Sequence, residues 1–205
     1  MRVAIAGFGP FPGAPVNSSG LLVEALARRR RPALAGTTLT TWIFATSYAA
    51  VDHDLPKLFA VKPDVVLIFG LAGKRRELCI ETRARNALAL LFPDASRQRP
   101  KRGVIAPNEP PSRRGNAPFT ALLAASRATG FPSRLSRDAG CYLCNYIYWQ
   151  ALGRVHGKRP LVQFVHIPLA QLAPRRPGKR HAPSFTRLVN AAEAILIALV
   201  AASRR

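Results

Sequence analysis

The chain alternates short hydrophobic runs with longer segments in which hydrophobic residues recur every three or four positions. The short runs predict strands, and they cover residues 3–6, 37–44, 64–69, 78–81, 132–136 and 161–165. The longer segments predict helices, and they cover residues 18–29, 48–59, 120–128, 144–152 and 184–202. For 205 residues, this alternation predicts one α/β domain over residues 1–205, a three-layer α/β/α sandwich with a mostly parallel, twisted central sheet.

Two loops interrupt the alternation. Residues 7–17 combine glycines and prolines with Phe8 and Phe11, which predicts an apolar pocket wall ahead of a helix capped by Ser18 or Ser19. Residues 92–118 are rich in proline, arginine, asparagine and serine, and they are too long for a simple connection. They predict a partly mobile excursion that serves as a lid or as an oligomer contact.

The lengths of the hydrophobic runs also indicate where in the cell the protein is located. The apolar run at residues 1–7 is too short for a signal peptide, and no run is expected to approach the length of a membrane span. We therefore expect a soluble, cytoplasmic protein that does not bind a membrane.

The charge is strongly basic, with 31 lysines and arginines against 10 acidic residues and a formal net charge of +21. Such a balance favours contact with acidic partners, but it does not indicate a fold. The arginines are dispersed in pairs and short runs, without a basic stripe interleaved with aromatic residues. We therefore predict no dedicated nucleic-acid site, while a basic protein that binds without catalysis stays an alternative.

Three cysteines, Cys79, Cys141 and Cys144, do not suggest a disulfide framework, and their number fits a reducing compartment. Cys141 and Cys144 have the spacing of redox and zinc sites, but no second such pair or close histidine pair completes a tetrahedral site. Zinc binding and disulfide exchange are therefore the less favoured interpretations. We predict no metal and no cofactor.

The candidate chemistry centres on Cys144, which follows the turn residues Asp138 and Gly140 at the start of a helix. Unpaired N–H groups and the helix dipole at that position stabilise a thiolate, the form that attacks carbonyl groups. Glu81 lies at the end of one predicted strand and His166 just beyond another, so a nucleophile, a base and an acid that orients the base can meet. The other histidines are poorer candidates because none follows a buried strand, namely His53, His156 and His181.

Five segments, taken in order, resemble the pyroglutamyl peptidase I family of cysteine peptidases. They are Gly7-Phe8-x-Pro10-Phe11-x-Gly13 with Asn17, Gly70-Leu71-Ala72-Gly73-x-Arg75, Glu81-x-x-Ala84-x-Asn86, Asp138-Ala139-Gly140-x-Tyr142-Leu143-Cys144-Asn145 and His166-Ile167-Pro168. The resemblance runs nearly from end to end, and the set of segments is more specific than any one of them.

The resemblance implies a phosphorylase/hydrolase-like fold and an enzyme that removes N-terminal pyroglutamate from peptide substrates. By this resemblance Cys144 attacks the pyroglutamyl carbonyl, His166 transfers the proton and Glu81 orients His166. It also implies a homo-oligomer, a dimer or a tetramer, and a lactam pocket formed by Phe8, Phe11, Asn17, Leu71, Phe92, Tyr142 and Leu143.

Two positions depart from the family pattern. Leu71 stands where the family commonly has glutamine, and Leu91 stands in a segment where the family commonly carries an arginine. A binding site that forms a specific hydrogen bond with its substrate strongly prefers that substrate, so a protein that lacks the bonding side chain loses this preference. The alternative function is therefore a related cysteine amidase or hydrolase that accepts a different acyl group.

Overall fold

A six-stranded sheet forms the centre of the computed structural model, which describes residues 1–11, 14–171 and 183–205. The strands follow the spatial order β2 (Thr38–Phe44), β1 (Arg2–Phe8), β3 (Val65–Leu71), β8 (Leu161–Ile167), β4 (Leu78–Glu81) and β7 (Ser133–Ser136). The first four strands of this order are parallel to one another. β4 runs antiparallel to β8 and parallel to β7, so the sheet is mostly parallel, as predicted.

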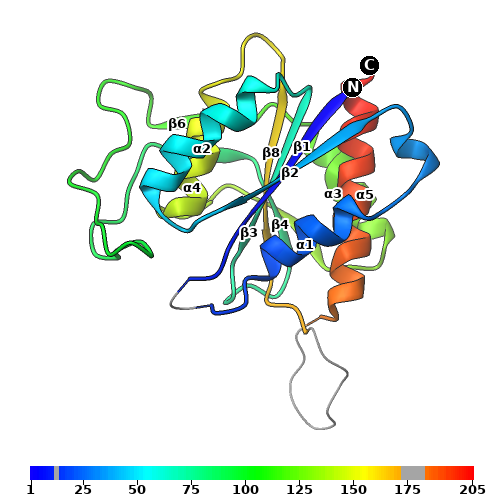
Figure 1. Cartoon of the computed structure of the whole chain (residues 1–205), viewed down its shortest axis with the longest axis horizontal. Coiled ribbons are helices and arrows are strands. Elements are labelled where there is room, and N and C mark those ends of the chain that lie inside the picture. Colours follow the sequence, from blue (N-terminus) through cyan, green and yellow to red (C-terminus); the bar gives the residue numbers. More distant parts are fainter. Residues whose placement is uncertain (12–13, 172–182) are drawn as a thin grey trace, which may run out of the picture.

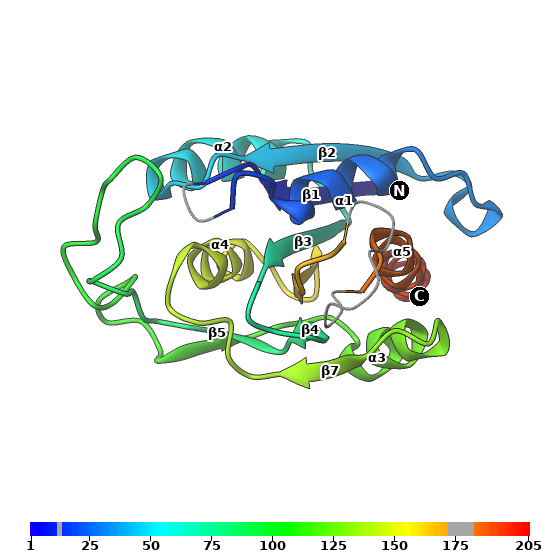
Figure 2. The ribbon, with the colours of Figure 1, turned by 90° about the horizontal axis from the view of Figure 1, so that it is seen from below.

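Helices cover both faces of the sheet (Figures 1 and 2). One face carries α1 (Ser18–Ala27), α3 (Phe119–Ala128) and α5 (Phe185–Ser203), and the other carries α2 (Tyr48–Ala60) and α4 (Leu143–Leu152). A short 3-10 helix, Pro32–Leu34, precedes β2. The predicted three-layer α/β/α sandwich is confirmed.

β3 shows why the hydrophobic runs form the centre of the sheet. Val65, Leu67 and Phe69 are fully buried against the layer of α1, α3 and α5. The residues between them, Val66 and Ile68, are fully buried against the layer of α2 and α4. Side chains of a strand alternate between the two faces, so a strand covered on both sides must be hydrophobic at every position.

The start of α1 differs from the prediction. Asn17 is the N-cap, and its side-chain oxygen accepts a hydrogen bond from the Ser19 backbone N–H at 3.1 Å. Ser18 and Ser19 already lie in the first helical turn, where Ser19 Oγ accepts a hydrogen bond from the Phe8 N–H at 3.0 Å. Asparagine caps helices as well as serine does, and the residue pattern alone does not separate the two.

The excursion after β4 contains a hairpin that the sequence pattern did not predict. β5 (Arg83–Arg85) pairs antiparallel with β6 (Ser112–Arg114). Each strand has three residues and is rich in arginine, so neither shows a hydrophobic alternation. Between the two strands, Asn86 accepts hydrogen bonds from the N–H groups of Ile105 and Ala106, both at 2.9 Å. The proposed roles as lid or oligomer contact stay predictions.

α5 corrects the expectation about membrane-length segments. Its 19 residues, with a mean hydropathy of 1.7, are long and apolar enough to span a membrane by length and composition. Half of that segment is buried, however, and Leu188, Ile195 and Leu199 are fully buried against the sheet. In this fold α5 is therefore a core helix.

Candidate active site

Glu81 and His166 form a buried pair across two antiparallel strands. His166 Nδ1 lies 2.8 Å from Glu81 Oε1, and the two residues are 5% and 0% exposed. His166 is the last residue but one of β8, where it pairs with Gly70 on one side and with Cys79 on the other. Because β4 runs antiparallel, Glu81 lies farther inside the sheet than His166, and not at the same edge.

The backbone of Glu81 is held as firmly as its side chain. Its carbonyl accepts hydrogen bonds from the Tyr148 hydroxyl and from the side-chain amide of Gln163, both at 3.0 Å. Tyr148 and Gln163 are themselves fully buried. The acid is therefore fixed by α4 and β8 together, which limits the positions that its carboxylate can adopt.

Arg75 is a member of this site that the sequence reasoning did not assign. Its Nη1 donates to Glu81 Oε1 at 2.6 Å and lies 3.4 Å from His166 Nδ1. Its Nη2 donates to the Asp138 carbonyl at 2.6 Å, at the start of the loop that leads to Cys144. Arg75 thus ties the acid to the nucleophile loop. The only signal in the sequence was its place in the glycine-rich turn, six residues before Glu81.

Cys144 lies in the first turn of α4, as predicted, with Tyr142 as an N-cap that makes no side-chain hydrogen bond. Its thiol sits directly over β3, because a Cβ atom built at Gly70 would lie 2.8 Å from Cys144 Sγ. The same Cβ atom would lie 2.6 Å from the buried ring of Phe164. A side chain at position 70 would therefore displace the thiol or the ring, which explains why glycine occupies this position.

The electrostatics of the pair follow from its burial and its neighbours. Burial acts to lower the pKa of His166, but the charges of Cys144 and Glu81 and the hydrogen bonds to both raise it to about 9. Burial acts to raise the pKa of Glu81, but His166, Ser136 and Arg75 hold it below its usual value. An imidazolium between a carboxylate and a sulfur is therefore the favoured charge state over a wide pH range.

The residues predicted for the lactam pocket fall into three groups. Phe8 and Leu143 are buried on the same face of the sheet as Cys144. Phe11 and Leu71 line a hollow of about 450 Å³ between the opening loop, the end of β3 and Leu169. Asn17 stands outside the three groups and holds the opening loop, since its amide donates to the Gly9 carbonyl at 3.0 Å.

The third group lies around the loop after Leu90. Leu91 and Phe92 are 78% and 64% exposed, so the part of the chain that the structure describes does not enclose either side chain. The Tyr142 hydroxyl donates to the Pro93 carbonyl at 2.8 Å and so joins this loop to the nucleophile loop. The role of Phe92 in binding stays a prediction.

The direction of the Leu71 side chain bears on the departure from the family pattern. Residues 65, 67 and 69 of β3 face α1 and α5, and strand alternation puts Leu71 on that side too. Gly70 faces the opposite side, where Cys144 lies. Leu71 therefore lines the hollow at the strand end, and Gly70 forms the wall beside the thiol.

His53 and His156 lie apart from this site, whereas Cys79 pairs with His166 in the sheet and Cys141 lies in the loop before Cys144. None of the three cysteines forms a disulfide. His53 lies exposed on α2 beside Asp54, and His156 is exposed after α4, while His181 lies outside the described residues. Within the described ranges, no group of three or more His, Cys, Asp or Glu side chains could hold a metal ion.

The sequence profile of the family described as pyroglutamyl peptidase matches residues 1–205. The chain belongs to the pyroglutamyl peptidase family. This membership, predicted from the five segments, makes it a cysteine-type omega peptidase with the activity class of pyroglutamyl peptidases.

Individual relatives agree with this assignment. A pyrrolidone-carboxylate peptidase of Chromobacterium violaceum is 32% identical over 178 residues, which cover 86% of this chain and 82% of that protein. One from Gloeobacter violaceus is 32% identical over 185 residues, with 87% of each chain covered.

Solved structures of the family share the fold. The pyrrolidone carboxyl peptidase of Thermus thermophilus matches with a TM-score of 0.85 at 29% identity, over 96% of this chain and 100% of that one. A mutant pyrrolidone carboxyl peptidase from Pyrococcus furiosus matches with a TM-score of 0.85 at 22% identity, over 99% and 100%. The likeness to the second structure supports the fold alone.

Proposed function

We propose that this pyroglutamyl peptidase family member cleaves N-terminal pyroglutamate from peptides through a Cys144-His166-Glu81 triad and an acyl-enzyme intermediate. The observation that carries the proposal is the buried contact of 2.8 Å between Glu81 Oε1 and His166 Nδ1, beside a thiol seated over Gly70. This arrangement supports the proposal, because acyl transfer uses a nucleophile, a base and an acid that orients the base.

In the proposed reaction Cys144 Sγ bonds to the pyroglutamyl carbonyl carbon, and the proton of the thiol resides on His166. The oxyanion forms near the first turn of α4, whose N–H groups have no partner within the helix. The C–N bond then breaks, and His166 gives its proton to the leaving amine. Water attacks the thioester, His166 takes a proton from it, and pyroglutamate leaves as the thiol reforms.

Substrate selection is proposed to rest on apolar surface more than on charge. A lactam is small and uncharged, and the predicted contacts Phe8, Phe11 and Leu143 are apolar. The orientation of Leu71 away from the thiol supports a pyroglutamyl acyl group, because Gly70, and not Leu71, is the residue of β3 beside Sγ.

A second candidate is a cysteine amidase for another acyl group. It is favoured by the hollow of about 450 Å³, where Leu71 offers no hydrogen-bonding side chain. A specific contact to a lactam carbonyl or N–H at that position would then be missing. The two candidates share the same triad and differ in the acyl group alone.

A substrate pair separates the two candidates. We expect a fluorogenic pyroglutamyl amide to be hydrolysed with a kcat/KM at least about 100-fold above that of the matching prolyl amide, which lacks the ring carbonyl. Both substrates carry the same leaving group, so the ratio reports recognition of the lactam. If the pyroglutamyl amide is not turned over while iodoacetamide still alkylates Cys144 rapidly, the amidase is the correct function.

The raised pKa of His166 predicts the pH dependence of the reaction. The leaving amine needs the imidazolium proton, so kcat/KM is expected to fall as pH rises through about 9. The raised pKa also affects the stability of the fold. The contact of protonated His166 with Glu81 stabilises the folded protein fully at pH values below the pKa of histidine in the unfolded chain, and this stabilisation is lost as pH rises through about 9. The measurement is kcat/KM across the range, with the ring resonances of His166 followed by NMR. A descending limb and an NMR midpoint near the ordinary histidine value of about 6.5 would contradict the coupling to Cys144 and Glu81.

A further inference from the structure

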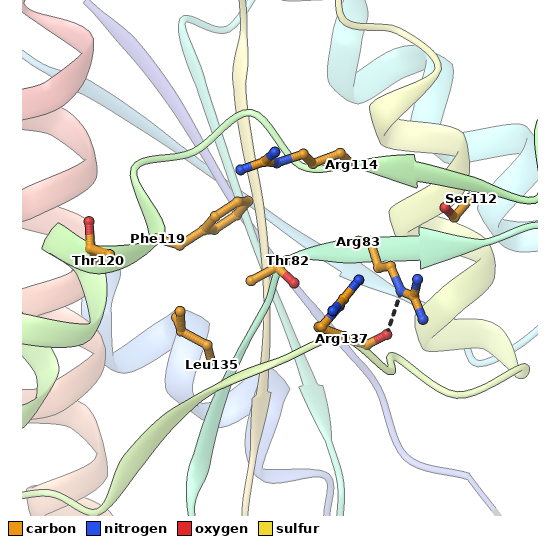
Figure 3. Close-up of a pocket in the computed structure, with 8 residues that line it drawn as sticks. All are labelled: Thr82, Arg83, Ser112, Arg114, Phe119, Thr120, Leu135 and Arg137. Atoms are coloured by element: carbon orange, nitrogen blue, oxygen red, sulfur yellow. Dashed lines mark hydrogen bonds between the residues drawn. The ribbon is translucent and has the colours of Figure 1, made fainter.

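A second hollow, of about 790 Å³, lies between the β5–β6 hairpin, the start of α3 and the end of β7 (Figure 3). It is called the arginine hollow below and shares no lining residue with the candidate active site. Phe119 and Leu135, which line it, pack on the core beneath α1, α3 and α5, whereas Cys144 packs on the opposite core. These two lining residues therefore lie on the face of the sheet opposite to the thiol.

Three arginines from three different elements line the arginine hollow. Arg83 comes from β5, Arg114 from β6, and Arg137 follows β7. Within the part of the chain that the structure describes, none of the three makes an ion pair, and no carboxylate lines the hollow. Their neighbours in sequence or on the same strands do pair with acids, namely Arg85 with Asp138, Arg113 with Glu109 and Arg134 with Glu77.

The hydrogen bonds of the three arginines leave most of their donors available. Arg83 Nε donates to the Arg137 carbonyl at 2.9 Å, the dashed line of Figure 3, which braces β5 against the end of β7. Its terminal nitrogens, and the side chains of Arg114 and Arg137, donate no hydrogen bond to any residue that the structure describes. Like charges gathered without acids repel one another, and a bound anion removes that cost.

The other groups around the hollow are also suited to an anion with an organic part. Ser112 and Thr120 add hydroxyl groups. Thr120 lies in the first turn of α3, and the N-cap of that helix, Pro118, makes no side-chain hydrogen bond. Phe119 and Leu135 supply an apolar surface, and Figure 3 shows Arg114 extending over the Phe119 ring.

The directions of the donors favour phosphate over carboxylate. A carboxylate presents two oxygens in one plane, which a single guanidinium satisfies. A phosphoryl group presents oxygens in several directions, and arginines from three elements approach from several directions. The hollow is bounded and has one aromatic ring, which fits a small molecule better than a nucleic acid strand on a row of stacked aromatic residues.

We propose that the arginine hollow is a binding site for a small phosphorylated anion with at least two negative charges. Arg83, Arg114 and Arg137 contact the phosphoryl oxygens, and the organic part of the ligand lies on Phe119 and Leu135. This proposal does not depend on the peptidase chemistry, so evidence against the triad would not contradict it.

Calorimetric titration of the full chain with inorganic pyrophosphate, ATP and citrate tests the proposal. Two variants are compared. Arg114→Ser with Arg137→Ser removes the two exposed arginines of the hollow and keeps Arg83 as the brace. Arg28→Ser with Arg205→Ser removes two exposed arginines elsewhere and is the matched control, since both variants lose the same charge.

Pyrophosphate and ATP are expected to bind the wild type saturably at about 0.15 M salt, and the hollow variant to lose about tenfold or more in affinity. The control variant is expected to stay within about twofold of the wild type. Phenylglyoxal modification of the wild type, mapped by mass spectrometry, is expected to slow at Arg114 and Arg137 when pyrophosphate is present.

Three outcomes would overturn the proposal. Equal losses in the two variants would show general attraction to a basic surface. Citrate binding as tightly as pyrophosphate would remove the preference for phosphate. Binding of a single-stranded oligonucleotide, without binding of pyrophosphate or ATP, would make the hollow part of a nucleic-acid surface.

Discussion

Replacing Cys144 with alanine is expected to lower kcat/KM for a pyroglutamyl amide by about 10⁴-fold or more, because no other group can form the acyl-enzyme. Cys144 Sγ lies over Gly70, and Cys144 is one of the groups that raise the pKa of His166. The measurement is initial rates on the fluorogenic amide, with the folded state checked by thermal unfolding.

Cys141→Ala is the matched control for this variant. Cys141 is a thiol in the same loop, three residues earlier, and it precedes the helix start at Tyr142. We expect it to retain at least about half of the wild-type rate, since exposed or partly exposed positions outside a site change little. If Cys144→Ala kept its activity and Cys141→Ala lost it, the nucleophile would be Cys141 and not Cys144.

Replacing Glu81 with glutamine is expected to lower kcat by about 10² to 10⁴-fold with little change in KM. The amide keeps the size of the side chain but loses its negative charge. Arg75 Nη1 and His166 Nδ1 both contact the same oxygen, Glu81 Oε1, at 2.6 Å and 2.8 Å, so the amide oxygen still accepts from both. Without the carboxylate charge the imidazolium that protonates the leaving amine is less stable, and kcat falls.

A second measurement on Glu81→Gln, the NMR titration of His166, separates the loss of the orienting charge from a general loss of stability. Glu81 helps to raise the pKa of His166, so the NMR midpoint of His166 is expected to fall in the variant. Glu77→Gln is the control, because Glu77 lies just before β4 and pairs with Arg134 at the surface at 3.1 Å. If Glu81→Gln kept full kcat and left the His166 midpoint unchanged, Glu81 would have no orienting role.

The hydrophobic pattern predicted most of the fold, because the core strands are covered on both faces. β3 and β8 read as continuous apolar runs, and the predicted strand at 78–81 matches β4 residue for residue. The pattern did not reveal that β4 runs antiparallel to β8, since strand direction depends on long-range pairing and not on the residues of one strand.

The candidate site was predicted in its chemical groups but not in its geometry. Cys144, His166 and Glu81 could be chosen because each follows a recognisable local signal, a helix start or a strand end. Arg75 could not, because an arginine in a turn is most often solvated, and its contacts to Glu81 and Asp138 join segments far apart in sequence. Assembly into a dimer or tetramer and cytoplasmic location stay predictions.

The pairing of the arginines could not be predicted from the sequence either. Net charge predicted a basic surface, but sequence spacing could not distinguish arginines that pair with an acidic residue from arginines that do not. Arg113 and Arg114 are adjacent, yet within the described chain only Arg113 meets an acid, Glu109 at 3.3 Å. Alternation along β6 sends neighbouring side chains to opposite faces, so position in the fold decides which arginine has a partner.

Mass spectrometry of an acid-quenched reaction shows directly whether Cys144 forms the acyl-enzyme. During steady-state turnover of a pyroglutamyl ester, we expect a pyroglutamyl thioester on the peptide that carries Cys144, which hydroxylamine removes. The thioester should be absent in His166→Ala on the same timescale. An adduct on Cys79 or Cys141, or turnover without any adduct on Cys144, would contradict the account.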